Sequence, residues 1–502
     1  MNAWNENDLF GFDGFEEGDG SSMGDSEDMR LWGLLSRLQW LTSRYLMNAG
    51  RDDAAIRDVS RGQGKVLTLL KLKPEISQKD LTVLMDMRQQ SLGELLSKLE
   101  KKGLVVREPS EEDRRKVIVR ITDEGRAEAE KLGERPTVEF AFFDCLTDEE
   151  KAGFVEGFLE EGDLNGNGGL KVFPVGKSTE TLQINMTDFE TFADATGTSL
   201  DELGTIEGIT KVAQRYYEWT DAQTPDVAGD GRPFFGRDAM ANYLITGSKQ
   251  LGHEILDIEG GTCTLSFDRA TMKTLWDNYY VPMVQGWFSA EGKFRSDAVK
   301  TGDLVCYVGS SSSVVYFPQT VTVDDATSYP IELGALPNPS FENGQPCSPQ
   351  QGAGFVVTKS DEKKETACAE FLKWFTAKEQ NTDFSVSAGY VPVTKDALTL
   401  ENLEAAAGSI EGASDNYLVN LPATLETIEA GVYANPPFKG GVEARAILER
   451  TLSDKAVADR TAVVEAVAAG TSPEEAVAPY LEDAAFDAWL ADLTTQLKGA
   501  IA

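Results

Sequence analysis

The sequence predicts a multi-domain chain, in which a small, mainly α-helical N-terminal domain with a short β-hairpin precedes a larger domain of different composition. Three observations support this organisation. The 502 residues are enough for two or three domains, each with its own core. Between residues 29 and 100 apolar residues recur at helical spacing, and two short runs rich in β-branched residues follow. Near residue 160 the composition shifts, and Gly and Asn accumulate.

The first elements follow one another in a recognisable order. Residues 1–28 are rich in Gly and carry nine acids and no Lys or Arg, which predicts a disordered acidic tail. From Met29 onward, leucines at helical spacing predict a helix that ends near Gly50. A second helix is centred on Leu67, and a capping box that begins at Ser77 opens a third.

A fourth helix and a hairpin complete the domain. The helix is marked by four leucines at residues 92–99 and ends at Gly103. The runs LVVRE and KVIVRIT then predict two short strands around the polar loop PSEEDRR, and a further helix begins at Asp123. Helix, turn, helix and hairpin, in this order, predict a winged helix-turn-helix fold.

The segment ISQKDLTVLMDMRQQSLGELLSKLEKKGLVVREPSEEDRRKVIVRITDEG resembles the bacterial MarR family of transcriptional regulators. The specific parts are LxKLEKKGLVxR and the wing DRRKVIVRITDEG. The resemblance implies a DNA-binding and dimerisation domain over residues 29–162. It also implies a repressor that binds duplex DNA as a homodimer.

The charge distribution agrees with a DNA partner only locally. The formal net charge of the whole chain is −36, which argues against nucleic acid. Residues 60–120, however, carry fourteen Lys or Arg and nine Asp or Glu. The basic surface is therefore expected on the predicted helix-turn-helix and wing, with acidic sequence on both sides.

Two groups of residues are candidates for DNA contact. Arg and Gln near the start of the fourth helix can make bidentate contacts to base edges in the major groove. In the family, the wing tip carries an Asp–Arg pair and an Arg that enters the minor groove. The alternatives are a solvated helix end and an ordinary charged turn. The candidates are Arg88, Gln89, Gln90, Ser91 and Glu94 in the helix, Asp113, Arg114, Arg115 and Lys116 in the wing, and Arg107 as a contact to the DNA backbone or a solvated charge.

The resemblance also implies a dimer interface made by the terminal helices, residues 29–47 and 140–162. The apolar residues Phe142, Phe143, Phe154, Phe158 and Leu159 fit this role. The alternative is packing of these residues within one chain.

After a linker at residues 163–169, the sequence resembles a different family. LKVFPVGKSTETLQINMTDFETFADATG, TGDLVCYVGSSSSVVYF, QGAGFVVTKSDEKKETACAEFLKWFTAKEQNTDFSVSAGYVPV and TSPEEAVAPYLEDAAFDAWLADL resemble, in order, the extracellular solute-binding proteins of ABC importers, the class of maltose-binding protein. The resemblance implies an α/β periplasmic-binding-protein-like fold over residues 170–502. This fold lacks the first segment of its N-terminal lobe.

In that family a sugar or other solute is held by hydroxyl and backbone groups and by an aromatic ring. The matching positions are Ser310, Ser311, Ser312, Ser313, Gly352, Gly354, Tyr390 and Phe438, with structural loop residues as the alternative. Because the absent segment normally covers the helix near residue 372, we expect Phe371, Leu372 and Phe375 to lack part of their cover. We therefore expect no sugar binding tighter than millimolar.

Several functions are disfavoured by composition. The chain has five scattered cysteines and one histidine, His253, so we expect no metal site, no cofactor and no catalytic triad. Cys145, surrounded by Phe, is expected to be an inert thiol rather than a redox sensor. The N-terminus has no secretory signal and no apolar run is long enough for a membrane helix, which predicts a cytoplasmic protein that is not an enzyme.

Three functions remain from the sequence. The first is a cytoplasmic repressor whose second domain senses a solute. The second is a DNA-binding regulator joined to a truncated, non-functional remnant of a solute-binding protein. The third is a transport receptor with an incidental N-terminal fusion, which the absence of an export signal disfavours. An intact DNA-binding function is common to the first two.

Overall fold

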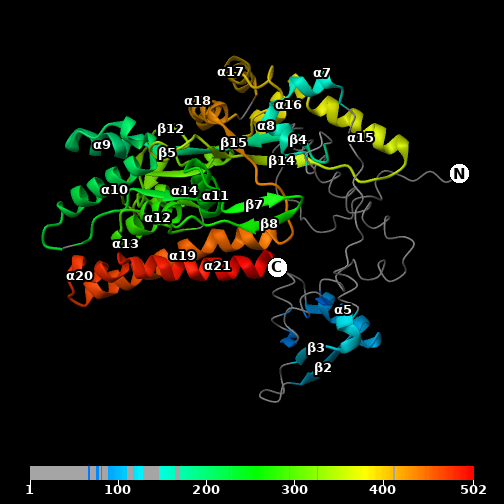
Figure 1. Ribbon diagram of the computed structural model, residues 1–502, viewed down its shortest axis with the longest axis horizontal. Helices are drawn as coiled ribbons and strands as arrows, with labels where there is room; N and C mark the ends of the chain where they lie inside the picture. Colours follow the sequence, from blue (N-terminus) through cyan, green and yellow to red (C-terminus); the bar gives the residue numbers. More distant parts are fainter. Residues whose placement is uncertain are drawn as a thin grey trace, which may run out of the picture. The chain divides into compact units, whose positions relative to one another are not determined.

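Two compact units divide the chain, one formed by Met1–Val138 and the other by Glu139–Ala502 (Figure 1). The computed structural model describes residues 66–67, 70, 75–78, 81, 89–109, 117–127, 146–163, 170–227, 229–292, 294–324, 326–410 and 413–501.

In the described part of the first unit, a helix and three strands share a core with apolar residues from the segment 66–81. The helix α5 spans Gln89–Lys101, and the strands β1 (Glu75–Ser77), β3 (Val117–Ile121) and β2 (Val105–Pro109) form an antiparallel sheet in the order β1-β3-β2. The core consists of buried apolar side chains that lie before, within and after α5: Val66, Leu67, Leu70, Ile76, Leu81, Leu92, Leu96, Leu99, Val105, Val119 and Ile121. The predicted fourth helix, its end at Gly103 and both hairpin strands are confirmed, whereas β1 was not predicted.

The larger unit is organised around a four-stranded sheet. Its strands are β12 (Leu333–Pro337), β5 (Glu180–Asn185), β9 (Cys306–Ser310) and β6 (Phe235–Arg237), in the order β12-β5-β9-β6. β5 is antiparallel to both β12 and β9, and β6 is parallel to β9. The buried apolar residues around this sheet form the large core, which includes Leu182, Phe234, Trp276, Val308 and Leu448.

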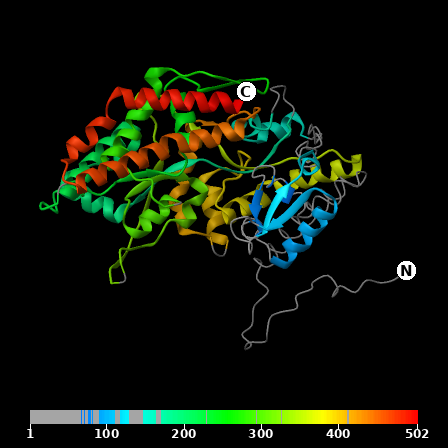
Figure 2. The ribbon, with the colours of Figure 1, turned by 90° about the horizontal axis from the view of Figure 1, so that it is seen from below.

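Helices surround this sheet, and the long C-terminal pair α19 and α21 runs along one side of it (Figures 1 and 2). The helices are α9 (Met186–Thr196), η2 (Leu200–Gly204), α10 (Ile206–Asp221), α11 (Met240–Gln250), α12 (Arg269–Asp277), α13 (Tyr280–Gln285), α14 (Arg295–Thr301), η3 (Ser311–Tyr316), α19 (Gly441–Ala468), α20 (Pro473–Val477), η4 (Ala478–Tyr480) and α21 (Asp483–Ile501).

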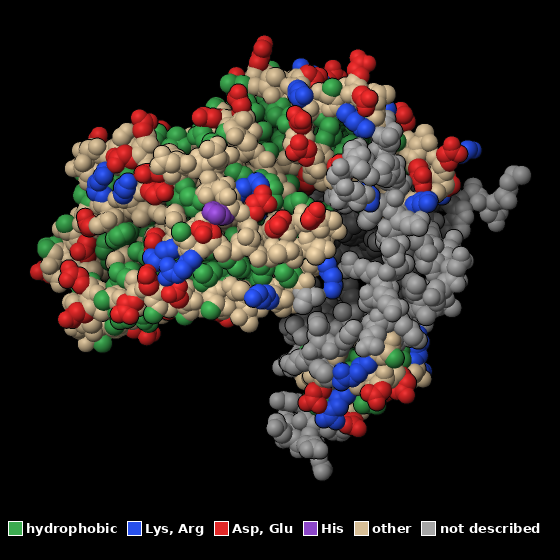
Figure 3. Space-filling view, in the orientation of Figure 1, with side chains coloured by type: hydrophobic (Ala, Val, Ile, Leu, Met, Phe, Trp, Pro, Cys, Tyr) green, Lys and Arg blue, Asp and Glu red, His purple; other side chains and the backbone are tan. Residues whose placement is uncertain are grey.

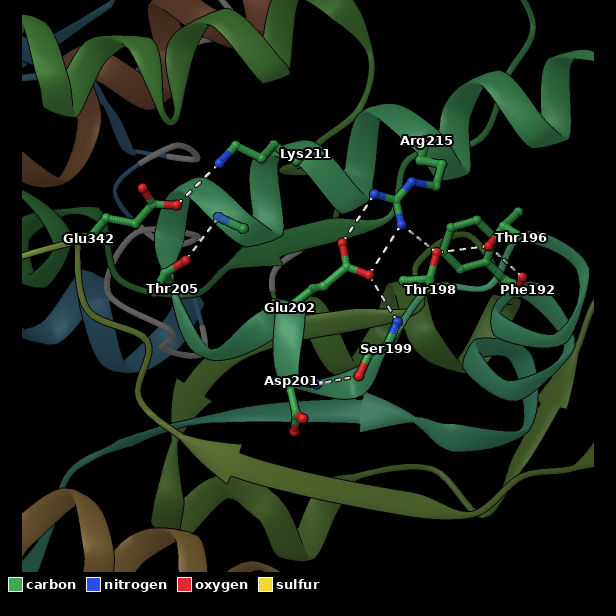
Figure 4. A network of polar contacts seen from close by, with 11 residues as sticks. Phe192, Thr196, Thr198, Ser199, Asp201, Glu202, Thr205, Lys211, Arg215 and Glu342 are labelled. Carbon is green, nitrogen blue, oxygen red and sulfur yellow. Dashed lines mark hydrogen bonds and ion pairs between the residues drawn. The ribbon is translucent and has the colours of Figure 1, made fainter.

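A polar network fixes the turn from α9 to α10, as Figure 4 shows. The two guanidinium nitrogens of Arg215 contact the carboxylate of Glu202 at 3.1 and 3.2 Å, and Arg215 also donates to the hydroxyl of Thr198. The hydrogen bonds from Arg215 hold the pKa of Glu202 below its usual range. Glu202 in turn accepts the backbone N–H of Ser199 in a capping box, so one carboxylate closes both the helix end and the turn.

The larger unit has a second core, called the small core below. Its sheet has two antiparallel strands, β4 (Phe173–Ser178) and β14 (Gln351–Phe355). The helices that contribute to this core are α8 (Glu156–Glu160), α15 (Glu362–Phe375), α16 (Lys378–Ala388), α17 (Leu400–Ser409) and α18 (Asp415–Ala430). The short helix α7 (Asp148–Gly153) precedes them and buries none of its residues. This small core contains Phe173, Val175, Leu372, Leu403 and Leu421.

The start of the larger unit corrects one prediction. Phe154 and Phe158 are buried in the small core, and the ring of Phe154 meets the ring of Phe173 edge-on at 5.7 Å. Leu159 packs against the same core. These residues therefore pack within one chain, which was the alternative to the dimer interface proposed for them. Phe142, Phe143, Cys145, the linker core at 164–169 and residues 29–47 lie outside the described residues.

Three two-stranded pairs complete the larger unit. They are β7 (Leu256–Glu259) with β8 (Thr262–Leu265), β10 (Thr320–Thr322) with β11 (Ser328–Pro330), and β13 (Ser348–Pro349) with β15 (Val432–Tyr433). Acidic side chains are spread over the face of this unit seen in Figure 3. In the described part of the chain, every helix is too short or too polar to cross a bilayer.

Candidate DNA-binding and ligand-binding sites

The helix α5 and the strand β2 are joined by a tight turn. Leu92, Leu96 and Leu99 bury one face of α5, and Lys98 and Lys101 lie exposed in its last turn. β2 begins at Val105, four residues after the helix ends. The short connection fixes the direction of the hairpin relative to the helix.

An ion pair strengthens this connection. The Nη2 atom of Arg107, in β2, lies 2.5 Å from Oε2 of Glu100 in α5, and its Nε lies 3.1 Å from the same oxygen. Arg107 also donates to the hydroxyl of Ser97 at 3.1 Å. The hydrogen bonds from Arg107 lower the pKa of Glu100. The guanidinium thus braces the hairpin against α5, and any contact to a DNA phosphate would compete with this pair.

A second arginine links all three strands of the small sheet. Arg120, in β3, donates to Glu75 in β1 at 2.8 Å and to Glu108 in β2 at 2.7 Å. The pairs are exposed, so each adds little to stability, but together they fix the register of the strands. β1 escaped prediction because three residues after Pro74 are too few for an alternating pattern to stand out.

The predicted DNA contacts fall mostly outside the part of the chain whose side chains are described. The backbone of Gln89, Gln90, Ser91 and Glu94 lies in the first two turns of α5, and their side chains are not described. Arg88 and the wing tip, Asp113, Arg114, Arg115 and Lys116, lie outside the described residues. Among the predicted DNA contacts, the side-chain position of Arg107 is therefore the one that is described.

In the larger unit, the serine loop follows β9 and is held mostly by internal bonds. Ser311 is buried, its hydroxyl accepts the N–H of Thr179, and its own N–H donates to the carbonyl of Thr179 at 2.8 Å. The hydroxyls of Ser310 and Ser312 lie 3.0 Å apart, and that of Ser313 donates to the carbonyl of Ser310. These hydroxyls therefore have partners within the protein.

The serine loop meets the turn that carries Tyr390. Gly389 has a φ of 76°, and a Cβ at this position would lie 2.8 Å from the carbonyl oxygen of Ser312. Only glycine allows this approach without strain. The structure thus brings the loop Ser310–Ser313 close to the turn that carries Tyr390, two of the predicted ligand-binding elements. This region lies where the large core and the small core meet, and it is called the seam below.

The other predicted ligand residues have different surroundings. Gly352 pairs with Lys177 where β14 and β4 run side by side. The neighbouring residue of β4, Gly176, lies close to the side chain of Tyr390. Gly354 lies beyond the bulge in that ladder, opposite Pro174. Phe438 packs on the large core just before α19, beside Gly441. It is partly buried, and the described contacts do not place it in the seam.

Two buried charged residues at the seam, Glu180 and Lys177, were not predicted from the sequence. The carboxylate of Glu180, at the start of β5, accepts from the amide of Asn242 at 2.6 Å and lies 3.4 Å from Nη1 of Arg237 at the end of β6. Arg445 donates to the same Asn242 at 2.5 Å. Burial raises the pKa of Glu180, against the opposing effect of the Arg237 charge. The one charged residue in the run STETLQI, which is rich in Thr and forms a strand, was the signal that could have indicated this network.

A second buried charge lies on β4. The side chain of Lys177 is almost fully buried, and its Nζ atom pairs with Glu161 at the end of α8. Gln350 donates to the same carboxylate. The hydroxyl of Thr179, two residues further along, is buried without a hydrogen-bond partner among the described residues. The seam is therefore polar, and most of its polar groups are satisfied by the protein itself.

A family model described as bacterial extracellular solute-binding protein matches residues 135–409, and the model of the MarR family matches residues 59–117. The first match covers more than half of the chain. The chain belongs to the bacterial extracellular solute-binding proteins. A MarR-family segment precedes its solute-binding part. The solute-binding match begins at residue 135, ahead of the predicted start at 170, in agreement with the packing of Phe154 and Phe158.

Curated relatives match the MarR-family segment. An uncharacterised HTH-type transcriptional regulator of Bacillus subtilis (strain 168), YfiV, is 32% identical over 136 residues, which are 26% of this chain and 81% of the relative. A second regulator of that strain, YdgJ, is 38% identical over 76 residues, 15% of this chain and 46% of the relative. Both families are of non-enzymatic kinds.

Solved structures resemble the larger unit at low sequence identity. The cyclic alpha-maltosyl-1,6-maltose binding protein from Arthrobacter globiformis is 17% identical, with a TM-score of 0.47, and covers 70% of this chain and 78% of its own. UgpB from Mycobacterium tuberculosis, in complex with glycerophosphocholine, is 17% identical, with a TM-score of 0.47, and covers 72% and 78%. Maltose-bound T. maritima MalE3 is 15% identical, with a TM-score of 0.41, and covers 65% and 75%.

Proposed function

We propose that this protein is a cytoplasmic transcriptional regulator of the MarR type that binds duplex DNA as a homodimer and acts as a repressor. The observation that carries the proposal is the match to an HTH-type regulator over 81% of that relative's length. The described part of the first unit supports it, because α5 and the β2–β3 hairpin share one core and are joined by the Arg107–Glu100 pair.

In this proposal the fold is a winged helix-turn-helix with α5 as the recognition helix. Its first turns carry Gln89 and Gln90, whose amides can read adenine edges in the major groove. The loop between β2 and β3 is the wing, and Arg114, Arg115 and Lys116 supply its positive charge. Arg107 is a positioning residue, since its internal ion pair sets the angle between the wing and the helix.

The dimer interface is proposed to involve residues 29–47. Phe154, Phe158 and Leu159 pack in the small core instead and are unsuited to that interface. The domain boundary between the regulator and the solute-binding part is accordingly proposed at Val138–Glu139 rather than at residue 162.

Two substitutions test the DNA-binding proposal. Arg115→Ala is expected to cost about 1–3 kcal/mol of DNA binding because it removes a wing-tip charge, while Gln90→Ala is expected to relax base preference at one position of each half-site. Fluorescence anisotropy with a selected operator and its single-base variants measures both effects. Arg450→Ala, on the exposed side of α19 in the larger unit, is the matched control for loss of one positive charge. Unchanged affinity and base preference in both variants would refute the assignments of helix and wing.

The larger unit supports a second candidate function, solute sensing, since the serine loop and Tyr390 meet in one polar seam. The hydroxyls of that loop, however, are bonded within the protein, and the small core has a sheet of two strands. We expect the unit to lack the first segment of its N-terminal lobe and to bind sugars with dissociation constants no lower than millimolar. Calorimetry of the full chain with maltose, maltotriose and cyclic glucans checks this, and one micromolar sugar would make solute sensing the leading function.

A further inference from the structure

A pocket far along the chain from the serine loop opens where α10, α13, α19 and α20 meet. These elements lie at the end of the larger unit that is on the left in Figure 1. The pocket is half-open, with a volume of about 590 Å³, within the range of small-molecule sites. Its lining combines an apolar wall with a few polar groups. The wall is formed by Val463, Val464, Val467, Val477 and Leu481.

The polar end of the pocket is Arg460. Its Nη1 atom donates to the carbonyl of Val284 at 3.3 Å. Gly286 has a φ of 85°, and a Cβ there would lie 2.4 Å from Nη2, so the glycine leaves the space that the guanidinium occupies. Among the described residues, no carboxylate forms an ion pair with Arg460. A guanidinium has five N–H groups, and one hydrogen bond from Arg460 to the described residues is formed, so further donors are left for a ligand.

Among the other polar side chains of the lining, those of Tyr217, Asp221 and Ser472 have partners within the protein. One oxygen of Asp221 accepts the backbone N–H groups of Gly229 and Asp230, at 2.8 and 2.9 Å. The hydroxyl of Tyr217 donates to the carbonyl of Gly229 at 2.7 Å. Glu474 lies in the first turn of α20 and is exposed. The lining has one positively charged side chain, Arg460, and two acidic ones, Asp221 and Glu474, so an anionic group of a ligand fits at Arg460, with the apolar remainder against the valines.

We propose that this pocket binds a small aliphatic monocarboxylate. The planar guanidinium of Arg460 matches the two oxygens of a carboxylate, and such charge-assisted pairs are stronger than neutral hydrogen bonds. The alkyl chain is removed from water by Val463, Val467 and Val477. The site is independent of the DNA-binding proposal and shares no lining residue with the seam.

Octanoate is the probe, and the full chain is the sample. Calorimetry compares octanoate with 1-octanol and octylamine, which have the same chain length and a neutral or positive head. Octanoate is expected to bind at least about tenfold more tightly than either. Arg460→Gln is expected to weaken octanoate binding by about tenfold or more, whereas Arg450→Gln, on the same helix with its side chain 53% exposed, leaves it unchanged.

A second variant guards against misfolding of Arg460→Gln. Val464 lines the pocket and is 50% exposed, so Val464→Glu adds a negative charge without disturbing a packed position. It is expected to abolish octanoate binding while the circular dichroism spectrum and the melting temperature stay those of the parent. The proposal is overturned if octanoate does not bind, if octanol binds equally well, or if both variants bind octanoate as the parent does.

Discussion

The two cores of the solute-binding part differ in how completely their helices are covered. The large core has a four-stranded sheet and buries aromatic residues such as Trp276, whose ring stacks on Tyr280 at 3.6 Å. The small core has two strands, and on its helix α15 the side chains of Phe371 and Trp374 are 46% and 55% exposed. Aromatic residues of the small core are buried elsewhere, as Phe158 and Phe173 are, so the exposure is specific to α15. Among the described residues, one side of α15 therefore has little cover.

The sequence predicts this lack of cover for three residues of α15, and in the structure the three differ in their exposure. Phe371 is exposed, as expected. Leu372 is 2% exposed and belongs to the small core, so the expectation was wrong for this residue. Phe375 is partly buried, with Phe355 and Phe384 at 6.0 and 4.9 Å between ring centres. Neighbouring residues of one helix point to different sides, and the expectation did not take this periodicity into account.

The largest expected effect concerns the buried charges beside the large core. Glu180→Ala removes one partner of Arg237 and leaves that guanidinium buried, which is expected to cost about 3–5 kcal/mol in the free energy of unfolding. Glu180→Gln keeps a hydrogen-bonding group beside Asn242 and is expected to cost clearly less. Chemical denaturation of both variants measures the difference. Equal and small losses would show that the charge pair is not needed by the fold.

A smaller effect sharpens the comparison within α15. Leu372→Ala is expected to cost about 2–5 kcal/mol because it opens a cavity in the small core. Phe371→Ala, one residue earlier, is expected to cost about 1 kcal/mol or less, since about half of its ring is already in water. Thermal and urea unfolding of the two variants give the values. A cost for Phe371→Ala as large as that for Leu372→Ala would mean that another surface covers this side of α15.

Local patterns in the sequence predicted more of the fold than of the sites. The leucine spacing before Gly103 and the runs around residues 105 and 117 were sufficient for α5 and its hairpin, because periodicity records which face is buried. The role of Phe154 and Phe158 could not be read in this way. Apolar residues on a short helix fit an interface between chains and a core within one chain equally well.

The seam shows the same limit for function. Ser310–Ser313 and Tyr390 are predicted ligand-binding residues from the family resemblance, and the structure places Gly389, next to Tyr390, against the backbone of Ser312. The bond between Thr179 and the hydroxyl of Ser311 joins segments more than 100 residues apart, which no local pattern encodes, whereas the bonds of the other serines to each other are local. Arg460 and its pocket depend in the same way on the meeting of four helices.

The central claim, that the chain is a DNA-binding regulator, is tested most directly by selection from a pool of genomic duplex fragments at low salt. The full chain is incubated with the pool, and the retained fragments are sequenced and titrated individually. We predict that near-palindromic fragments are retained, with a dissociation constant on the order of 10⁻⁸ M that rises steeply with added salt. Retention of no sequence above background, with the protein folded by circular dichroism, would contradict the claim.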